Sequence, residues 1–276
     1  MADAAARESG YDDNPDFKIV FEPSPRRVRV MAGGETIADS AAMRLLHEPG
    51  HLPVYYFPRG DVRMDLLQQS DHETHCPWKG LARYWSVGSG DHPVENAAWS
   101  YEDPYAQIAE IAGYVSFYWS KMDHWYEEDE EVFVHARDPY KRVDVVDSIR
   151  QVRVVLGGET VAETTRARFL FETGLPTRYY IPRADVRAEL LEPSDTETQC
   201  PYKGIAAYHS VRVGGKRFED IVWYYPDPIA ECPRIKDYLC FFNEHVDAIF
   251  VDGAEMPCPE THWTKRYPQS LMLDHM

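Results

Sequence analysis

Two short stretches of the sequence place a thiol, an ammonium group, carboxylates and hydroxyls within a few residues of one another. The first runs from Ser70 to Gly80 (SDHETHCPWKG), and the second runs from Ser194 to Gly204 (SDTETQCPYKG), 124 positions later. Both follow the pattern S-D-x-E-T-x-C-P-(aromatic)-K-G. A fold does not need so many reactive groups for its shape alone, so we treat these stretches as candidate sites of chemistry.

Cys76 and Cys200 are candidate nucleophiles, because a nearby cation lowers the pKa of a thiol and favours the reactive thiolate. Lys79 and Lys203 each follow three residues later. The alternative is a small buried thiol whose reactivity has no role. In the first stretch His75 adjoins the cysteine and is a candidate base, whereas the second stretch has a glutamine there. We therefore predict that Cys76 is more reactive than Cys200.

The two lysines have two interpretations. Each could hold an anionic substrate or form a Schiff base with a carbonyl. Alternatively, each could pair with a carboxylate of its own stretch and so hold the segment in place. Those carboxylates are Asp71 and Glu73 for Lys79, and Asp195 and Glu197 for Lys203. We favour the ligand interpretation, because an otherwise acidic chain keeps two cations in each of these regions.

Arginines and aromatic residues supply further candidate ligand contacts in both copies. Arg59 and Arg183 follow strand prolines and could clamp a carboxylate or phosphate, or form ion pairs with Asp61 and Asp185. Aromatic side chains on the following strands could line a flat-walled pocket, although such residues are more often part of the core. The ligand-binding candidates are Arg59, Asp71, Thr74, Tyr84, Trp99 and Tyr101, with Arg183, Asp195, Thr198, Tyr208, Trp223 and Tyr225 in the second copy.

A metal site is considered for the first stretch alone. His72, His75 and Cys76 carry side chains that bind zinc, but the second copy has Thr196 and Gln199 at the positions of the two histidines. A fourth ligand at the usual spacing is not found. We therefore expect no metal and no other cofactor.

Composition excludes several classes of function. The chain has 276 residues and a formal net charge of −17, which argues against sequence-independent binding to nucleic acid or to anionic membranes. No apolar run is long enough to cross a bilayer, and the first ten residues lack the apolar core of a secretory signal. The five cysteines include no C-x-x-C pair, so we expect reduced thiols in a cytoplasmic protein.

Alternating apolar residues and turn signals predict short strands in both copies. In the first copy we expect strands at 28–30, 36–38, 55–58, 81–87, 98–101 and 114–119, and the second copy repeats them and ends with a strand at 246–251. Gly33-Gly34 is expected to be a hairpin turn. A short helix is expected at 61–67, and the Cys-Pro-Lys-Gly region is expected to be the loop after it. Asp-Pro at 103–104 and 227–228 predicts two helix starts, with Pro233 shortening the second helix.

The register of the two copies stays constant without a gap from Arg26/Arg150 to Asp123/Asp247. We predict a mainly β (α+β) protein with two homologous compact domains of about 100 residues, each with one or two short helices. We expect a monomer whose two copies pack about a pseudo-twofold axis, as in a symmetric dimer. The expected divisions are an acidic tail at 1–23, repeat 1 at 24–124, a charged linker at 125–147, repeat 2 at 148–253, and a tail at 254–276.

The combined motif resembles the family called domain of unknown function 427, in its tandem, double-domain actinobacterial form. The residues that carry the resemblance are Arg59, Asp61, Val62, Ser70, Asp71, Thr74, Cys76, Pro77, Lys79, Gly80, Trp99, Tyr101, Asp103 and Pro104, with the matching positions of the second copy and the connector 137–145. The resemblance implies a compact, largely β fold, and the family's label implies nucleotidyl transfer. That reaction typically uses paired carboxylates that bind Mg²⁺ and a glycine-rich phosphate loop, and neither pattern is found in the sequence.

We expect from the residues a protein that binds a small anionic or aromatic molecule in a Cys/Lys/Arg/aromatic pocket of each repeat. The first repeat, which has His75, is the better candidate for chemistry. The alternative is a non-catalytic scaffold or ligand-sensing protein in which the T-x-C-P-x-K-G segment is structural. The sequence leaves open whether the protein is an enzyme.

Overall fold

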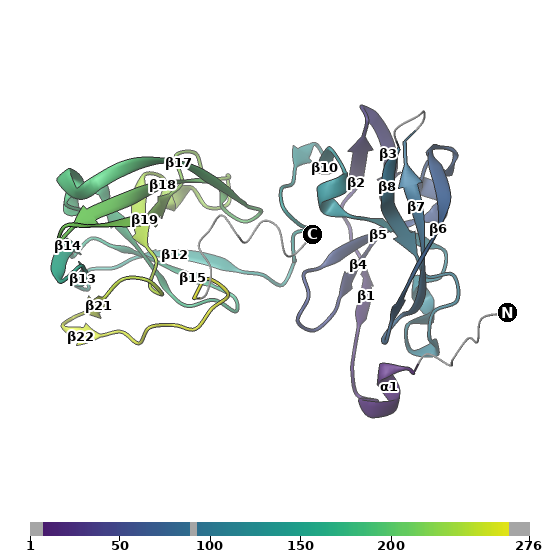
Figure 1. Ribbon diagram of the computed structural model, residues 1–276, viewed down its shortest axis with the longest axis horizontal. Coiled ribbons are helices and arrows are strands. Elements are labelled where there is room, and N and C mark those ends of the chain that lie inside the picture. Colours follow the sequence, from purple (N-terminus) through teal and green to yellow (C-terminus); the bar gives the residue numbers. More distant parts are fainter. Residues whose placement is uncertain (1–7, 89–92, 265–276) are drawn as a thin grey trace. The chain divides into compact units, whose positions relative to one another are not determined.

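The computed structural model describes residues 8–88 and 93–264. The outer parts of the two expected tails, residues 1–7 and 265–276, lie outside the described residues. The chain divides into two compact units, Met1–Arg137 and Asp138–Met276. Figure 1 shows that each unit holds one copy of the repeat, the first drawn from purple to teal and the second from teal through green to yellow.

Repeat 1 consists of two antiparallel sheets, as the period-two alternation predicts. The seven-stranded sheet has, in spatial order, β1 (Val20–Pro23), β4 (Arg44–His47), β5 (Val54–Pro58), β9 (Tyr114–Phe117), β8 (Val94–Ser100), β7 (Gly80–Val87) and β6 (Leu67–Cys76). The four-stranded sheet has β11 (Glu130–Glu131), β10 (His124–Glu127), β2 (Val28–Ala32) and β3 (Glu35–Ser40).

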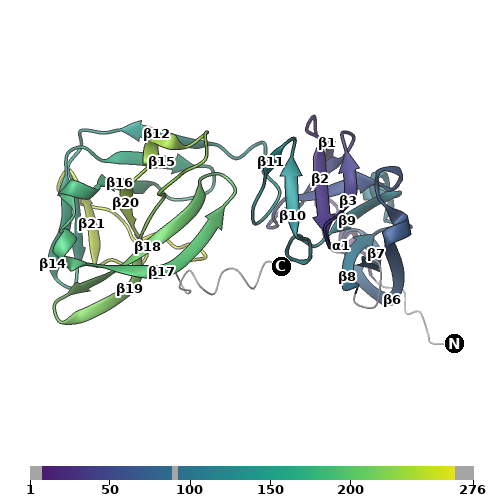
Figure 2. The same cartoon turned by 90° about the horizontal axis from the view of Figure 1, so that it is seen from above.

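Repeat 2 has the same two sheets with the strands in the same spatial order. Figure 2 shows its large sheet, from β12 and β15 to β18 and β17. Its seven-stranded sheet has β12 (Val143–Asp147), β15 (Arg168–Glu172), β16 (Arg178–Pro182), β20 (Tyr238–Phe241), β19 (Lys216–Tyr224), β18 (Gly204–Val213) and β17 (Leu191–Cys200). Its four-stranded sheet has β14 (Glu159–Thr164), β13 (Val152–Leu156), β21 (Ala248–Val251) and β22 (Ala254–Glu255). The predicted fold class, two homologous β-rich domains, is confirmed.

Helices are few and short in the described part of the chain. They comprise α1 (Gly10–Asp13) and the 3-10 turns η1 (Arg59–Asp61), η2 (Met64–Leu66), η3 (Ala106–Ile111), η4 (Trp119–Lys121), η5 (Arg183–Asp185), η6 (Ala188–Leu190) and η7 (Pro233–Ile235). None of the described helices has the length and apolar character needed to cross a lipid bilayer.

Strand alternation gives the large sheet of repeat 1 two apolar faces. Trp85 faces the layer between the two sheets, where it packs with Val30 and Phe57. Its neighbour Tyr84 faces the outer side, where it packs with Tyr56 and with residues of η3. The candidate chemistry lies on this outer side, because Cys76 also packs there.

The expected loop between residues 70 and 80 is in fact the end of a long strand. β6 continues to Cys76 and pairs with β7, with a register shift between Gln69 and Glu73 that marks a β-bulge. The strand was missed because β6 lies at the edge of the sheet and its alternate residues are polar rather than apolar.

The Asp-Pro pairs do not begin helices. Pro104 forms an isolated β-bridge with Gly80, and Pro228 forms the same bridge with Gly204. In repeat 2, Pro233 begins the 3-10 turn η7, whereas we expected it to interrupt a helix. The Asp-Pro segments therefore hold the Cys-Pro-Lys turns in place instead of starting helices.

The repeats extend beyond the expected divisions. Residues 20–23 and 143–147, expected in the acidic tail and the linker, form edge strands β1 and β12. Residues 124–131 form β10 and β11, which belong to repeat 1. Within the expected loose tail, Tyr11 is buried and forms part of α1.

Candidate functional site

A tight hairpin turn brings the cysteine and lysine of each repeat together. Cys76, the last residue of β6, pairs with Gly80, the first residue of β7, so that Pro77, Trp78 and Lys79 make the turn. Gly80 has φ of 100°, and a Cβ at this position would lie 3.4 Å from the carbonyl oxygen of Asp103. The turn therefore requires glycine.

The lysine of the turn forms a buried ion pair with a glutamate from a distant strand. Lys79 Nζ donates to Glu48, the residue that follows β4, and both side chains are 9% exposed. In repeat 2, Lys203 Nζ donates to Glu172 Oε2 at 2.5 Å. The prediction that Lys79 pairs with a carboxylate of its own stretch was wrong. Glu73 pairs with Arg83 at 2.6 Å instead.

Repeat 2 adds a second lysine to this pair. Lys141 Nζ lies 3.3 Å from Glu172 Oε1. Burial alone would raise the pKa of Glu172, but Lys203 and Lys141 outweigh it and hold the pKa below its usual value. Burial alone would lower the pKa of Lys203, but Cys200 and Glu172 outweigh it and raise the pKa. The thiol, the ammonium groups and the carboxylate therefore act on one another electrostatically.

Three tyrosines surround each cysteine, and we call each set a tyrosine cluster. The clusters are Tyr56, Tyr84 and Tyr101 in repeat 1, and Tyr180, Tyr208 and Tyr225 in repeat 2. Burial is the main cause that raises the pKa of Tyr101, followed by Tyr56 and Cys76. Burial likewise raises the pKa of Tyr208 to about 12. The phenols of Tyr101 and Tyr208 therefore stay protonated at neutral pH and can donate hydrogen bonds.

Two polar contacts of the clusters occur in both repeats. Thr74 Oγ1 lies 2.8 Å from the Tyr84 hydroxyl, and Thr198 Oγ1 lies 2.7 Å from that of Tyr208. Trp99 Nε1 donates to the Tyr56 hydroxyl at 3.2 Å. In repeat 2, Trp223 Nε1 donates to Tyr180 at 3.0 Å. The structure thus brings together the threonine, cysteine, lysine, tyrosine and tryptophan candidates of each repeat.

The two arginines do not join these clusters. Arg59 stacks over Trp85, with its guanidinium carbon 5.3 Å from the ring centre, and pairs with Glu102 at 3.1 Å instead of with Asp61. Trp85 faces the side of the sheet opposite to Tyr84, so Arg59 lies away from Lys79. Arg183 likewise stacks over Tyr224 at 5.1 Å.

The acidic candidates and His75 also lie apart from the clusters, whereas the ring of His72 packs against Tyr84 with a centroid distance of 4.6 Å. Asp71 and Asp195 are exposed on the edge strands. His75 Nε2 lies 2.8 Å from the hydroxyl of Tyr105. Because neighbouring residues of a strand point to opposite faces, this imidazole is directed away from the face of Cys76.

We predict that His209 makes repeat 2 less stable in mild acid. Its Nε2 accepts from Arg183 at 3.2 Å, and its ring stacks on Tyr224 at 5.0 Å. Burial, followed by Arg183, lowers its pKa below the usual 6.5. The unfolded chain therefore binds this proton more readily, so stability is full above pH 6.5 and falls as the pH drops toward the folded pKa.

Calorimetry between about pH 7.5 and about pH 5.5 checks this expectation. The matched variant is His209→Trp, because repeat 1 has Trp85 at this position with Arg59 stacked on it. The melting temperature of repeat 2 should fall less steeply with acid in this variant than in the unmodified chain. Equal slopes would contradict the prediction.

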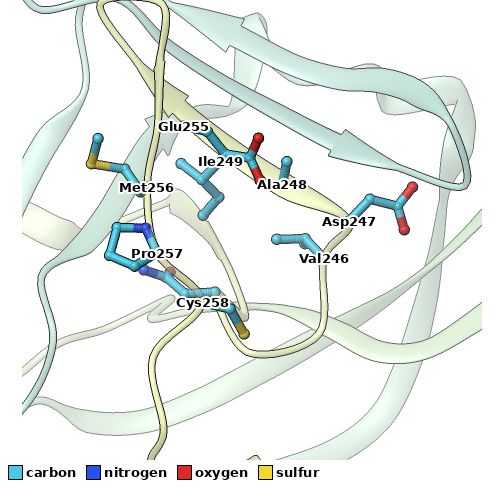
Figure 3. Close-up of a pocket in the computed structure, with 9 residues that line it drawn as sticks. Val246, Asp247, Ala248, Ile249, Glu255, Met256, Pro257 and Cys258 are labelled. Atoms are coloured by element: carbon cyan, nitrogen blue, oxygen red, sulfur yellow. The ribbon is translucent and has the colours of Figure 1, made fainter.

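Two cavities in the described residues lie away from the tyrosine clusters. Figure 3 shows the smaller one, of about 40 Å³, beside β21 and β22 with Met256, Pro257 and Cys258 in its wall. The other is a shallow depression lined by Asp185, Arg187 and neighbouring residues. Within residues 8–88 and 93–264, no group of three His, Cys, Asp or Glu side chains could hold a metal ion.

Sequence reasoning missed the glutamates, which are central to both sites. Glu48 and Glu172 occur in the repeated pattern R-x-L-x-E-x-G, at the same spacing of 124 positions as the two cysteines. A search for every polar residue retained by both copies would have found them. Tyr56 and Tyr180 could have been found by the same search.

Comparison with known proteins gives one result that covers most of the chain. A family model described as a domain of unknown function (DUF427) matches residues 20–128 and again residues 144–252. These two segments contain both hairpin turns and both buried glutamates. A search of curated proteins found no match to the sequence.

Proposed function

The chain belongs to the DUF427 family through both of its repeats, and from this premise we propose that each repeat binds a small molecule beside its Cys–Lys–Glu group. Repeat 1 is the proposed reactive site. The ligand is a small anionic or aromatic molecule. The candidate reacting group is the thiol of Cys76, whose thiolate is the nucleophilic form.

One observation carries the proposal: in both repeats a partly exposed thiol adjoins a buried ion pair. Cys76 and Cys200 are intermediate in exposure, whereas the Lys79–Glu48 pair is almost fully buried. Burying two charges costs several kcal/mol, and apolar residues of similar size often stabilise a protein as well or better. The presence of the same pair beside the same thiol in both copies therefore supports a role beyond folding.

The neighbouring side chains receive separate roles in this proposal. Lys79 is a positioning residue, because its ammonium is directed to Glu48 and fixes the turn that carries Cys76. The hydroxyl pair of Thr74 and Tyr84 supplies hydrogen bonds to a polar group of the ligand. The indole of Trp99, which is partly exposed, supplies an apolar wall.

Native mass spectrometry of the protein purified from cells tests the proposal. We expect an added mass of a small molecule on the full chain, reduced in Cys76→Ser and retained in the control Cys258→Ser, whose thiol is exposed and lies in the C-terminal segment. If neither form carries an added mass and Cys76→Ser melts at the same temperature as the unmodified chain, the proposal fails. The alternative, a scaffold in which the turn only ties strands together, is favoured by the fact that both lysines already have carboxylate partners.

The order of thiol reactivity, Cys76 before Cys200, stays a prediction. Its reason is the imidazole next to Cys76 in the sequence. Because this imidazole lies on the other face of β6 beside Tyr105, it acts on the thiol only at a distance and not as a base in contact with it. Peptide mass spectrometry after brief treatment with neutral iodoacetamide measures both rates in one sample. His75→Gln, which introduces the residue of the second copy, should remove the difference. Equal labelling of both thiols in the unmodified chain would count against repeat 1 as the reactive site.

A further inference from the structure

The hairpin turn of repeat 1 is covered by the segment that precedes its first strand. The ring of Phe17 stacks on Trp78 with a centroid distance of 3.8 Å and an interplanar angle of 14°. Tyr11 contacts the same indole edge-on at 5.1 Å. The backbone N–H of Gly10 donates to the carbonyl of Pro77 at 2.8 Å. Residues 10–17, which we call the cover segment of repeat 1, thus lie directly on the turn.

The turn of repeat 2 is contacted by residues 138–141, which correspond to residues 14–17 of repeat 1, but the contacts are polar and cationic instead of aromatic. The backbone N–H of Asp138 donates to the hydroxyl of Tyr202 at 2.8 Å. Lys141 Nζ lies 5.8 Å from the centre of the Tyr202 ring. In the constant register of the repeats, Lys141 takes the place of Phe17, and Tyr202 takes the place of Trp78. A stacked aromatic pair in repeat 1 is therefore a cation–π pair in repeat 2.

The cover segments give the two sites different charges. In repeat 1, one ammonium, on Lys79, faces one carboxylate, on Glu48. Tyr11 adds a neutral phenol that is 6% exposed, and its pKa is raised by burial first and then by Glu48 and Cys76. In repeat 2, two ammonium groups face the single carboxylate of Glu172. Repeat 2 therefore carries one more positive charge at this group.

We infer that the cover segment completes the site of each repeat and that position 17/141 determines which ligand class the site accepts. Phe17 and Tyr11 give repeat 1 a neutral, aromatic wall suited to an uncharged or aromatic molecule. Lys141 gives repeat 2 a preference for a molecule that carries a carboxylate or a phosphate. The ligand assignment rests on the proposed function, whereas the charge difference between the two thiol environments does not.

Two alkylating reagents of different charge test the inference without the natural ligand. Iodoacetamide is neutral and iodoacetate is anionic, and in both cases the thiolate sulfur displaces iodide. The ratio of the iodoacetate rate to the iodoacetamide rate is expected to be roughly fivefold higher at Cys200 than at Cys76 at low ionic strength, and lower in high salt. The swap variants Lys141→Phe and Phe17→Lys should lower the ratio at Cys200 and raise it at Cys76.

The outcomes separate this inference from the proposed function. Equal ratios at the two thiols, or a ratio at Cys200 that Lys141→Phe leaves unchanged, would overturn the inference. A native mass spectrum without a bound molecule and an unchanged melting temperature of Cys76→Ser, combined with the expected ratios, would refute the proposed function and leave the charge difference established.

A second variant tests whether the cover segment controls access to Cys76. A Cβ on Gly10 would lie 2.7 Å from the Trp78 ring, so Gly10→Val should displace the segment. Cys76 should then react several-fold faster with both reagents, while Cys200 is unchanged. Gly60→Val is the control, because a Cβ there meets nothing within 4 Å. An unchanged Cys76 rate in Gly10→Val, with a circular dichroism spectrum like that of the unmodified chain, would show that the segment is not a barrier.

Discussion

Lys79→Met is expected to destabilise repeat 1 by about 3–5 kcal/mol. The change leaves Glu48 buried without its counter-ion, because the ammonium of Lys79 is the charge paired with it. Calorimetry of the full chain should show the melting of repeat 1 shifted downward, with repeat 2 unchanged. Hydrogen exchange of the β6 and β7 amides locates the effect, since these strands flank the turn.

The second repeat provides the matched comparison for this prediction. Lys203→Met should cost less, because Lys141 Nζ remains 3.3 Å from Glu172. The double variant Lys79→Met, Glu48→Leu should recover much of the lost stability, since no unpaired charge is left. If Lys79→Met has the same melting temperature as the unmodified chain, the ion pair does not hold the turn. The lysine could then serve as a ligand contact.

Arg178→Met is expected to destabilise repeat 2 by about 3–5 kcal/mol. Arg178 forms two hydrogen bonds of 2.7 Å with Glu244, whose side chain has no exposed surface. The guanidinium also lies 5.4 Å from the ring centre of Trp223 and 5.1 Å from that of Trp263. Without the guanidinium, the Glu244 carboxylate is buried without a counter-ion, and a gap is left between the two indoles. The melting temperature of repeat 2 should therefore fall.

The control for this prediction comes from repeat 1, which has Val54 and Ser120 at the equivalent positions. The double variant Arg178→Val, Glu244→Ser should therefore be more stable than Arg178→Met alone. Thr261 also donates to Glu244, at 2.7 Å, so the segment that contains Trp263 should become more sensitive to proteolysis in the single variant. If Arg178→Met is as stable as the double variant, the Arg178–Glu244 ion pair does not stabilise repeat 2.

The sequence predicted the strands that have an apolar, alternating face, because period-two burial is a local property. The aromatic strands ending at Pro58 and Pro182 and the hairpin at Gly33-Gly34 are examples. The exact repeat spacing also predicted that the two domains share one fold. The packing of the two copies about a pseudo-twofold axis stays a prediction.

The candidate site was predicted only in part, because ion pairs depend on contacts between residues far apart in the chain. Lys79 and Glu48 come from different hairpins, so local spacing pointed instead to Asp71 and Glu73. Arg59 was expected in the pocket for its position after a strand proline, but it stacks on Trp85, which strand alternation directs to the other face of the sheet. A polar edge strand such as β6 has no apolar alternation to identify it.

The β-bulge in β6 has a consequence for how molecules of this protein meet one another. β6 is an outer strand of its sheet, with free backbone groups that another chain could join by edge-to-edge pairing. Asp71, which lies in the bulge, places an exposed negative charge on this strand, and β17 repeats the arrangement with Asp195. Bulges and charges on an outer strand are the means by which natural sheets resist aggregation. The exposed carboxylates of the S-D-x-E-T-x-C-P stretches are thus suited to oppose edge-to-edge pairing along β6 and β17.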